Sequence, residues 1–223
     1  MTISSVYPTE RERVAVDAAE KLMREAMAHN DPSHDPLHVL RVRHTAMKLA
    51  RGIPSVDLFV VELAALLHDI LDKKYVPEGT DARAHFAPFF AQFSDVLSAE
   101  RAELVLRVVE HVSWTTEKKL RAAGQWGAWH DKCLELHCVQ DADRLDAIGA
   151  IGVLRCAAYS SRIDRPLYVP PVLGDAEDSA IGHFHVKLVH IRDQLKTAEG
   201  KRLGEQRHNF LLQFLEHVDQ ECN

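Results

Sequence analysis

The sequence predicts an all-α fold, and three observations support this prediction. Ala and Leu are abundant, while aromatic residues make up only 7% of the 223 residues, a balance that favours helices over strands. Apolar residues recur at the spacing of amphipathic helices. No segment shows the alternation of apolar and polar residues that is typical of strands. With 46% hydrophobic residues, the chain is long enough for one core, so we expect a single domain over residues 1–223.

Start and stop signals define the first two predicted helices. Thr9 with Glu12 three residues later forms a capping-box pattern, and apolar residues behind it fall on one helical face. The turn cluster DPSHDP follows. A second helix is predicted over about residues 37–51, because Gly52 and Pro54 end the pattern.

A third helix is predicted over about residues 56–71. Its segment LFVVELAALL is apolar almost all round, which predicts a buried, central position. Beyond it we expect a short helix broken at Pro88 and a further helix within residues 99–114. Residues 115–133, with two Gly and two Trp, are interpreted as an irregular excursion.

The last third of the chain is again helical in pattern. One long helix is predicted over residues 134–160, where small residues such as Ala147 and Gly152 allow close packing. A Pro-rich loop over residues 161–179 follows. Two closing helices are predicted over about residues 176–196 and 201–217, which gives seven to nine helices in all.

Composition limits the classes of partner. The net charge of −6 and the sequence pI of about 6.1 give no general attraction to nucleic acid or to an anionic membrane. No apolar run approaches the ~18 residues of a membrane span, and the N-terminal residues lack the apolar core of a secretory signal. The four cysteines form no C-x-x-C pair. We therefore expect reduced thiols and a cytoplasmic location.

The segment LLHDILDKKY raises the question of function, because it places His68 and Asp69 at the end of an apolar helix. An ionised Asp there costs several kcal/mol of desolvation unless it is paired or bound to a metal. Together with His38 and Asp143, the pair would form a set of two imidazoles and two carboxylates. Such a set favours one divalent ion among Mn, Fe(II), Co, Ni and Mg. The alternative is a group of helix caps and buried ion pairs.

The ordered motifs HVLRV, ALLHD and DADRL resemble the HD superfamily of metal-dependent phosphohydrolases. With GHFHVKL and KTAEGKRLGEQRHNFLLQFLE, the resemblance covers about residues 34–216 and is closest to small bacterial-type nucleoside triphosphate pyrophosphohydrolases. It implies a single HD-type helical bundle in which the metal ligands are His38, His68, Asp69 and Asp143. It also implies that Asp72, three residues after the HD pair, acts on the attacking water, and leaves Asp141 as a cap or a support of the ligands.

The resemblance implies hydrolysis of a nucleotide or a related small phosphate compound, in the first place (d)NTP pyrophosphohydrolysis. Basic side chains would then neutralise the phosphoryl charge; the candidates are Arg41, Lys73, Arg144 and Lys187. Tyr75, Trp114 and Tyr168 are candidates for stacking on a base. His34 is a further candidate beside the ligands, and a homodimer is left open.

Two other functions remain open at this point. A di-iron HD-type oxygenase would need additional histidines, for which His111 is a candidate, although the chain has no adjacent pair of histidines. A non-catalytic HD module that binds a nucleotide is the other alternative. It is less favoured, because none of the four ligands is missing.

Overall fold

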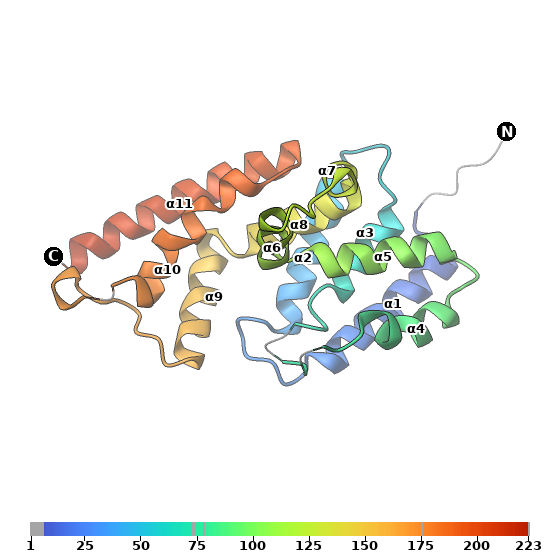
Figure 1. The fold of residues 1–223 in the computed structure, drawn as a ribbon, viewed down its shortest axis with the longest axis horizontal. Helices are drawn as coiled ribbons and strands as arrows, with labels where there is room; N and C mark the ends of the chain where they lie inside the picture. The colour runs from blue at the N-terminus through green and yellow to red at the C-terminus, as the bar shows by residue number, and fades with distance from the viewer. Residues whose placement is uncertain (1–6, 73–74, 78, 175, 223) are drawn as a thin grey trace.

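The computed structural model describes residues 7–72, 75–77, 79–174 and 176–222. Within these residues the chain forms eleven α-helices, three short 3-10 helices and no strand (Figure 1), which confirms the all-α prediction. The α-helices are α1 (Glu10–Ala26), α2 (Pro36–Ala50), α3 (Leu58–Leu67), α4 (Ala82–Gln92), α5 (Ala99–His111), α6 (Trp114–Ala122), α7 (Ala128–Lys132), α8 (Leu134–Asp146), α9 (Gly149–Arg162), α10 (Ala180–Val186) and α11 (Ala198–Cys222). The 3-10 helices are η1 (Pro171–Leu173), η2 (Ala176–Asp178) and η3 (Leu188–Gln194).

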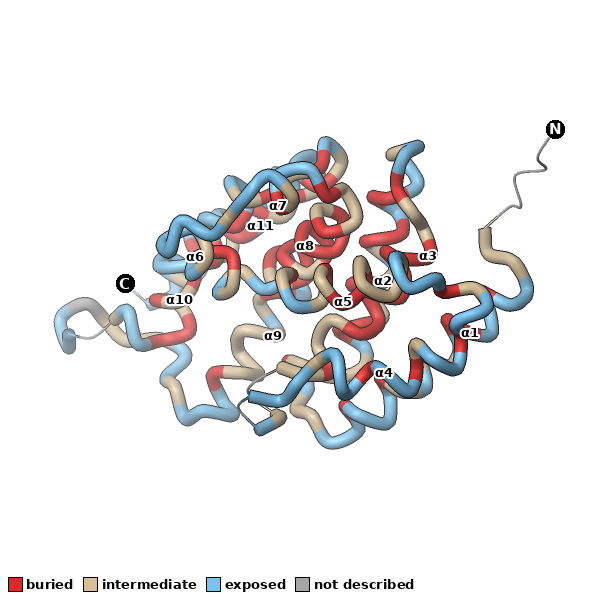
Figure 2. The backbone as a smooth tube through the Cα atoms, turned by 45° about the vertical axis from the view of Figure 1, so that its right-hand side comes forward, coloured by how far each residue is buried: buried red, intermediate tan, exposed pale blue. Residues whose placement is uncertain are grey.

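Helix α3 is the centre of the core. Residues 59–67 are all buried, and α1, α2, α5 and α8 pack around them. Figure 2 shows the buried backbone concentrated along these central helices, with α4 and α6 more exposed. The predicted central position of the apolar helix is therefore confirmed. Each fully buried Leu or Phe contributes about 1.5–3 kcal/mol to folding relative to an exposed position.

Local capping explains where α1, α2 and α3 begin. Thr9 and Glu12 form the predicted capping box. Asp35 accepts a hydrogen bond from the backbone N of His38 at 2.9 Å, and Pro36 occupies the first position of α2. Asp57 caps α3 through the backbone N of Phe59. The caps of α2 and α3 fix the start of the helix that carries His38 and of the helix that ends at His68.

The prediction of one long helix over residues 134–160 is wrong, because this segment forms two helices, α8 and α9. Ala147 and Ile148 separate the two helices, and Gly149 has φ +78°, a conformation that favours glycine. A side chain at Gly149 would also meet the side chain of Arg207. Because of this break, the acidic segment 141–146 lies at the C-terminal end of α8 and α9 takes a direction of its own.

Three further expectations are corrected. The excursion over residues 115–133 contains α6 and α7, and α4 continues through Pro88 without a break. The helix predicted over residues 176–196 consists of three shorter helices, η2, α10 and η3. The number of α-helices in the described residues therefore exceeds the predicted seven to nine.

Helix α11 is attached to the core through its first residues. Asp141 accepts hydrogen bonds from the backbone N of Lys196 and from both the N and the Oγ1 of Thr197, the last two at 2.7 Å. A Cβ at Gly200 would lie 2.4 Å from Asp141 Oδ2, so only glycine allows this approach. Asp141 thus holds Lys196 and Thr197 just before α11, and Thr197 Oγ1 caps that helix by accepting from the backbone N of Gly200. Asp141 therefore positions the cap residue of α11 and is not the cap itself.

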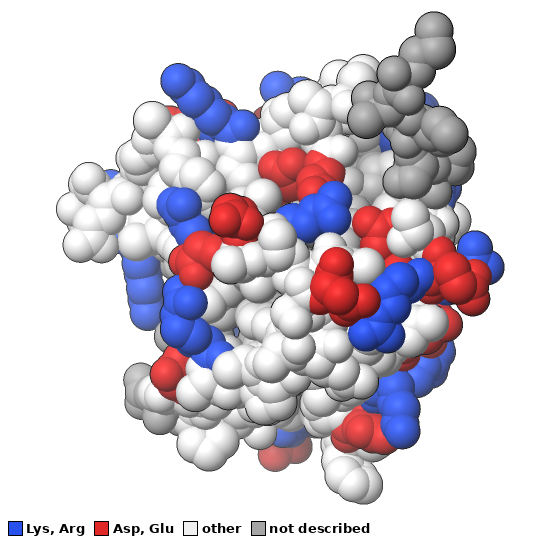
Figure 3. All heavy atoms as spheres, turned by 90° about the vertical axis from the view of Figure 1, so that its right-hand side faces the viewer, with Lys and Arg blue, Asp and Glu red and all other residues white. Residues whose placement is uncertain are grey.

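Charged side chains of both signs cover the end of the molecule where α1, α4 and α5 lie. Figure 3 shows acidic and basic side chains next to one another on this face, without a large area of one sign. Arg11 on α1 pairs with Asp95 at 2.7 Å, and Arg83 pairs with Glu103 at 2.7 Å. None of the described helices is both long and apolar enough to cross a membrane.

Candidate functional site

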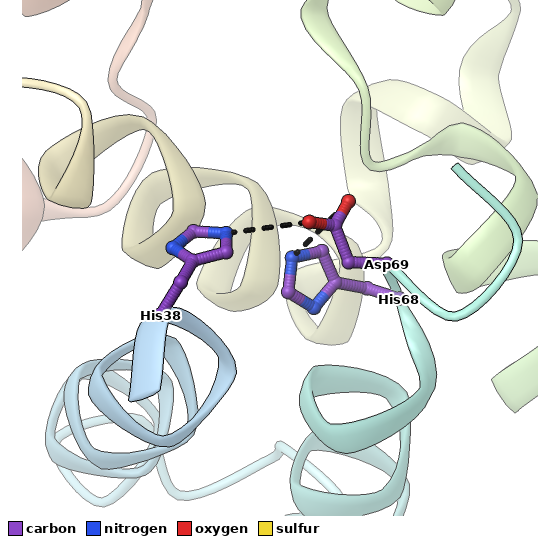
Figure 4. Close-up of side chains that lie close together, drawn as sticks. All are labelled: His38, His68 and Asp69. Carbon is purple, nitrogen blue, oxygen red and sulfur yellow. Dashed lines mark ion pairs between the residues drawn. The ribbon is translucent and has the colours of Figure 1, made fainter. Parts of the chain in front are cut away.

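Three helices bring the predicted ligand residues together. His38 lies in the first turn of α2, His68 ends α3, Asp69 follows in the next turn, and Asp143 lies in the last turn of α8. Figure 4 shows His38, His68 and Asp69 pointing toward one another. Their ligand atoms all lie within 4.8 Å of one another. The structure therefore assembles in space what the sequence separates by more than one hundred residues.

Both imidazoles present Nε2 to the centre of this group, because the other ring nitrogen is held elsewhere. His38 Nδ1 lies 2.8 Å from Asp146 Oδ2, and His68 Nδ1 lies 2.8 Å from the carbonyl oxygen of Ala65. Each Nδ1 therefore carries the hydrogen and donates it, which leaves the lone pair on Nε2. This is the tautomer in which histidine binds a metal through Nε2.

The distances across the group are too long for hydrogen bonds. His38 Nε2 lies 3.6 Å from Asp69 Oδ2 and 3.5 Å from Asp143 Oδ1, and His68 Nε2 lies 3.9 Å from one oxygen of each carboxylate. An N–H···O hydrogen bond has about 2.7–3.2 Å between its heavy atoms. Two ligands that each lie about 2.1 Å from a shared ion are about 3–4 Å apart, which fits these values.

The Nε2 atom of His68 is buried without a hydrogen-bond partner among the described residues, which costs free energy. An unpaired buried polar atom costs about 1–3 kcal/mol. A cation removes this cost, since it binds the lone pair and neutralises the two carboxylates beside it. The orphaned nitrogen and the mixed nitrogen and oxygen donors therefore fit a divalent ion.

The carboxylates of the group are ionised at neutral pH. Burial raises the pKa of Asp69 and of Asp143, but the positive charge that His68 and His38 carry when they are protonated outweighs burial and holds both pKa values below the ordinary range. The side chains of Asp69 and Asp143 are 17% and 29% exposed, while both histidines are almost completely buried. The carboxylate side of the group is therefore the side that solvent and a ligand can reach.

Asp146 is a site residue to which the sequence analysis gave no role. Its carboxylate accepts from His38 Nδ1 at 2.8 Å and from two nitrogens of Arg41, at 2.8 and 3.0 Å. Burial raises the pKa of Asp146, but the hydrogen bonds from His38 and Arg41 dominate and lower it to about 2. Asp146 thus fixes the tautomer and the orientation of His38. Its position three residues after Asp143, on the same helical face, is the signal that could have identified it.

His34 and Asp72, the two residues predicted to assist the ligands, lie outside the helices α2 and α3. His34 lies outside α2, as its place before Pro36 predicts; its Nδ1 lies 2.6 Å from Ser33 Oγ, and its ring centre is 6.4 Å from that of His38. Asp72 is half-buried in the turn after α3, and its backbone N donates to the carbonyl of Asp69. Helix α3 was predicted to reach residue 71 but ends at Leu67, so Asp72 follows Asp69 through a turn.

Two predicted residues are not brought to the ligands. Arg144 is 3% exposed, and its guanidinium donates to Glu117 Oε2 at 2.6 Å and to the carbonyl of Gln194. Its charge is therefore engaged by a buried ion pair with Glu117 and not by a phosphate group. His111 Nδ1 lies 2.6 Å from the carbonyl of Arg107, and its ring packs against Trp129 and His130.

The three remaining basic candidates are Lys73, Lys187 and Arg41. Lys73 lies outside the described residues. Lys187 is exposed at the end of α10, with Nζ 5.9 Å from the centre of the Trp114 ring. Arg41 is the candidate that lies next to the ligand group, through Asp146.

Comparisons with known proteins find a matching family model and related chains. Residues 37–148 match the model of the family described as HD domain. The protein YpgQ of Bacillus subtilis (strain 168) is 35% identical over 189 residues, which are 84% of each chain. The protein L803 of Acanthamoeba polyphaga mimivirus is 29% identical over 203 residues, with 77% of this chain and 81% of that protein covered.

Solved structures share the whole arrangement of helices. The crystal structure of B. subtilis YpgQ in complex with ADP aligns with a TM-score of 0.73 and 27% identity over the structural alignment, which covers 95% of this chain and 96% of YpgQ. The crystal structure of an HD-superfamily hydrolase from Bacillus thuringiensis aligns with a TM-score of 0.72 and 26% identity, covering 95% and 98% of the two chains.

Proposed function

Because the chain belongs to the HD domain family, we propose that it is a metal-dependent phosphohydrolase acting on a nucleotide. Its fold is that of HD-superfamily hydrolases. The observation that carries the proposal is the buried Nε2 of His68, which has no protein partner among the described residues and lies 3.9 Å from an oxygen of Asp69 and of Asp143. A cation between these atoms is the arrangement that removes their mutual repulsion.

One divalent ion would be held by His38, His68, Asp69 and Asp143. When bound, such an ion supplies a Lewis acid that polarises a phosphoryl oxygen and makes a coordinated water more acidic. The two imidazoles reach this centre from the buried side, while the partly exposed carboxylates border the side open to substrate. The mixed nitrogen and oxygen donors, with no thiolate in the set, suit Mn, Co, Ni, Mg and Fe(II), and Mn²⁺ is the ion that the experiments below use.

The residues of the chain have separate roles in the proposed reaction. Asp72 accepts the proton of the attacking water, which adds to phosphorus as the phosphoanhydride bond breaks and pyrophosphate leaves. Arg41, Lys73 and Lys187 contribute positive charge for the phosphate groups. The side chain of Arg41 is 34% exposed, so part of it is accessible to a ligand.

A nucleotide is the substrate class with the best support. The relative YpgQ has been crystallised with ADP. In this chain, Tyr75 lies 5.8 Å from the ring of His34, which in turn lies next to His38. An aromatic side chain beside His34, on this side of the site, is suited to stacking on a base. Within this class, (d)NTP pyrophosphohydrolysis in the cytoplasm is the activity that we propose.

The test combines metal content with product release. We expect about one metal ion per chain, and release of pyrophosphate or phosphate from a panel of dNTPs, NTPs and monophosphates with added Mn²⁺, Co²⁺, Ni²⁺ or Mg²⁺. Asp72→Asn should lose most of the turnover while still binding the ion. Two irons per chain with O₂-dependent turnover would favour the oxygenase instead, and nucleotide binding without turnover would favour the non-catalytic module.

A further inference from the structure

One face of helix α9 is directed at the segment that leads into α2. Arg155, Tyr159 and Arg162 follow one another at the i, i+4, i+7 spacing of a single helical face. Arg155 Nε donates to the carbonyl of Ser33 at 2.7 Å, and Arg162 donates to Asp31 at 2.6 Å. The ring of Tyr159 lies 5.5 Å from the ring of His34. This face therefore borders the metal-ligand group on the side of α2.

Arg155 differs from Arg162 because it also reaches Asp146, the carboxylate that holds the ligand His38. Its NH1 lies 3.3 Å from Asp146 Oδ2, the same oxygen that accepts from His38 Nδ1. The charge of Arg155 is close enough to contribute to the lowered pKa of both Asp143 and Asp146. Arg155 also lies beyond residues 37–148, the part of the chain that matches the family model.

The positive charge of Arg155 is not neutralised by Asp146 alone. Arg41 already pairs with both oxygens of that carboxylate, at 2.8 and 3.0 Å. The one carboxylate thus faces two guanidinium groups. The charge of Arg155 also acts on Asp143, one of the proposed metal ligands, so a phosphate bound to an ion at these ligands is an anion that this guanidinium can attract.

The guanidinium of Arg155 also has N–H groups that can donate hydrogen bonds to a ligand. Only two of its five N–H groups have partners among the described residues, and the contact with Asp146 is longer than a good hydrogen bond. The side chain is 13% exposed, so a ligand can reach it. Its backbone contact with Ser33 holds the side chain in place, which is the preorganisation that a phosphate-binding arginine requires.

From these contacts we propose that Arg155 binds a phosphate group of the substrate next to the metal ligands, an inference that rests on the proposed phosphohydrolase function. The group has the planar fork that matches phosphate oxygens. The competing interpretation is that Arg155 only fastens the segment 31–34 to α9, a role that Arg162 shares.

The experiment measures binding of inorganic pyrophosphate to the Mn²⁺-loaded protein by calorimetry, without turnover. Arg155→Gln should weaken this binding by about 10- to 100-fold, the range expected for loss of a charged hydrogen bond, and Arg155→Lys should retain part of it. Arg162→Gln is the matched control, because it removes an attachment of the same segment without touching Asp146. It should bind pyrophosphate as the wild type does.

The outcomes separate the inference from the function on which it rests. Unchanged pyrophosphate affinity in Arg155→Gln, or equal losses in Arg155→Gln and Arg162→Gln, would overturn the role of Arg155 alone. A parallel loss of Mn²⁺ affinity in Arg155→Gln would also overturn it, since Arg155 would then act through Asp146. A wild-type protein that neither binds pyrophosphate nor hydrolyses any phosphate compound would overturn the proposed function, and the inference with it.

Discussion

Asp146 offers the sharpest test of the metal centre, because it touches one ligand and is not itself a ligand. Its hydrogen bond with His38 Nδ1 is 2.8 Å long, buried and charge-assisted. In Asp146→Ala the Nδ1–H would lose its acceptor, and nothing would hold the ring with Nε2 toward Asp69 and Asp143. The variant should therefore bind a metal ion more weakly while all four proposed ligands remain.

The size of the effect follows from the kind of bond that is removed. A hydrogen bond to a charged group contributes about 1.5–3 kcal/mol, and loss of such a support to a ligand weakens metal binding by about 10- to 100-fold. At a Mn²⁺ concentration 100 times the wild-type Kd, the ion should stabilise the wild type by about 2.7 kcal/mol, but Asp146→Ala by only about 0.4–1.4 kcal/mol. Asp146→Asn keeps a carbonyl acceptor and should lie between the two.

The assay is a calorimetric Mn²⁺ titration, with thermal unfolding with and without Mn²⁺ on the same samples. Asp95→Asn is the control for the loss of one negative charge, because Asp95 is exposed and pairs with Arg11 far along the chain from the ligands. It should bind Mn²⁺ as the wild type does. Wild-type Mn²⁺ affinity in folded Asp146→Ala and Asp146→Asn would refute the argument that Asp146 orients His38.

Three further outcomes are expected. The double variant His68→Ala with Asp69→Ala should lose metal binding and turnover but keep its helical circular dichroism, and full activity would contradict the proposed centre. Glu117→Gln should destabilise the fold by about 3–5 kcal/mol, because it leaves the buried Arg144 unpaired; a denaturation midpoint equal to that of the wild type would exclude this role. Burial, with the charges of Lys187 and others, lowers the pKa of His183 to about 4. Since the unfolded imidazole titrates near 6.5, stability should fall as the pH decreases from about 6.5 to 4, and His183→Gln should show a shallower fall in melting temperature over this range.

The parts of the fold that the sequence predicts are those governed by local signals. The start of α1 follows from the capping box of Thr9 and Glu12, and the burial of α3 follows from its apolar composition. The break between α8 and α9 was not predicted, because a single Gly is tolerated within a helical pattern. That break depends on the positive φ of Gly149 and on the neighbouring Arg207, which belongs to α11. Such a contact between distant segments leaves no periodic signal.

The same distinction separates the site residues that could be found from those that could not. His68 and Asp69 are unusual for their positions, since each is a costly polar group at the end of an apolar helix. The motifs HVLRV and DADRL add His38 and Asp143 to this pair, and the structure brings the four residues together. Arg144 stands beside Asp143 in the sequence and was expected to face the same ligand. Adjacent residues of a helix point about 100° apart, and Arg144 accordingly pairs with Glu117 in the core. Proximity in sequence is therefore a poor guide to a phosphate-binding residue on a helix.

The break that hid Arg155 from sequence reasoning is also what gives it access to the site. A helix continued straight from α8 would carry Arg155 about 18 Å along the axis from Asp143, since each residue adds 1.5 Å. The change of direction at Gly149 instead returns α9 to the segment before α2, so that Arg155 reaches Ser33 and Asp146 at once. Arg155 of α9 thus meets Asp146 at the end of α8, and this carboxylate holds the metal ligand His38. A substitution at Gly149 should therefore weaken phosphate binding through Arg155 more than it weakens metal binding by the four ligands.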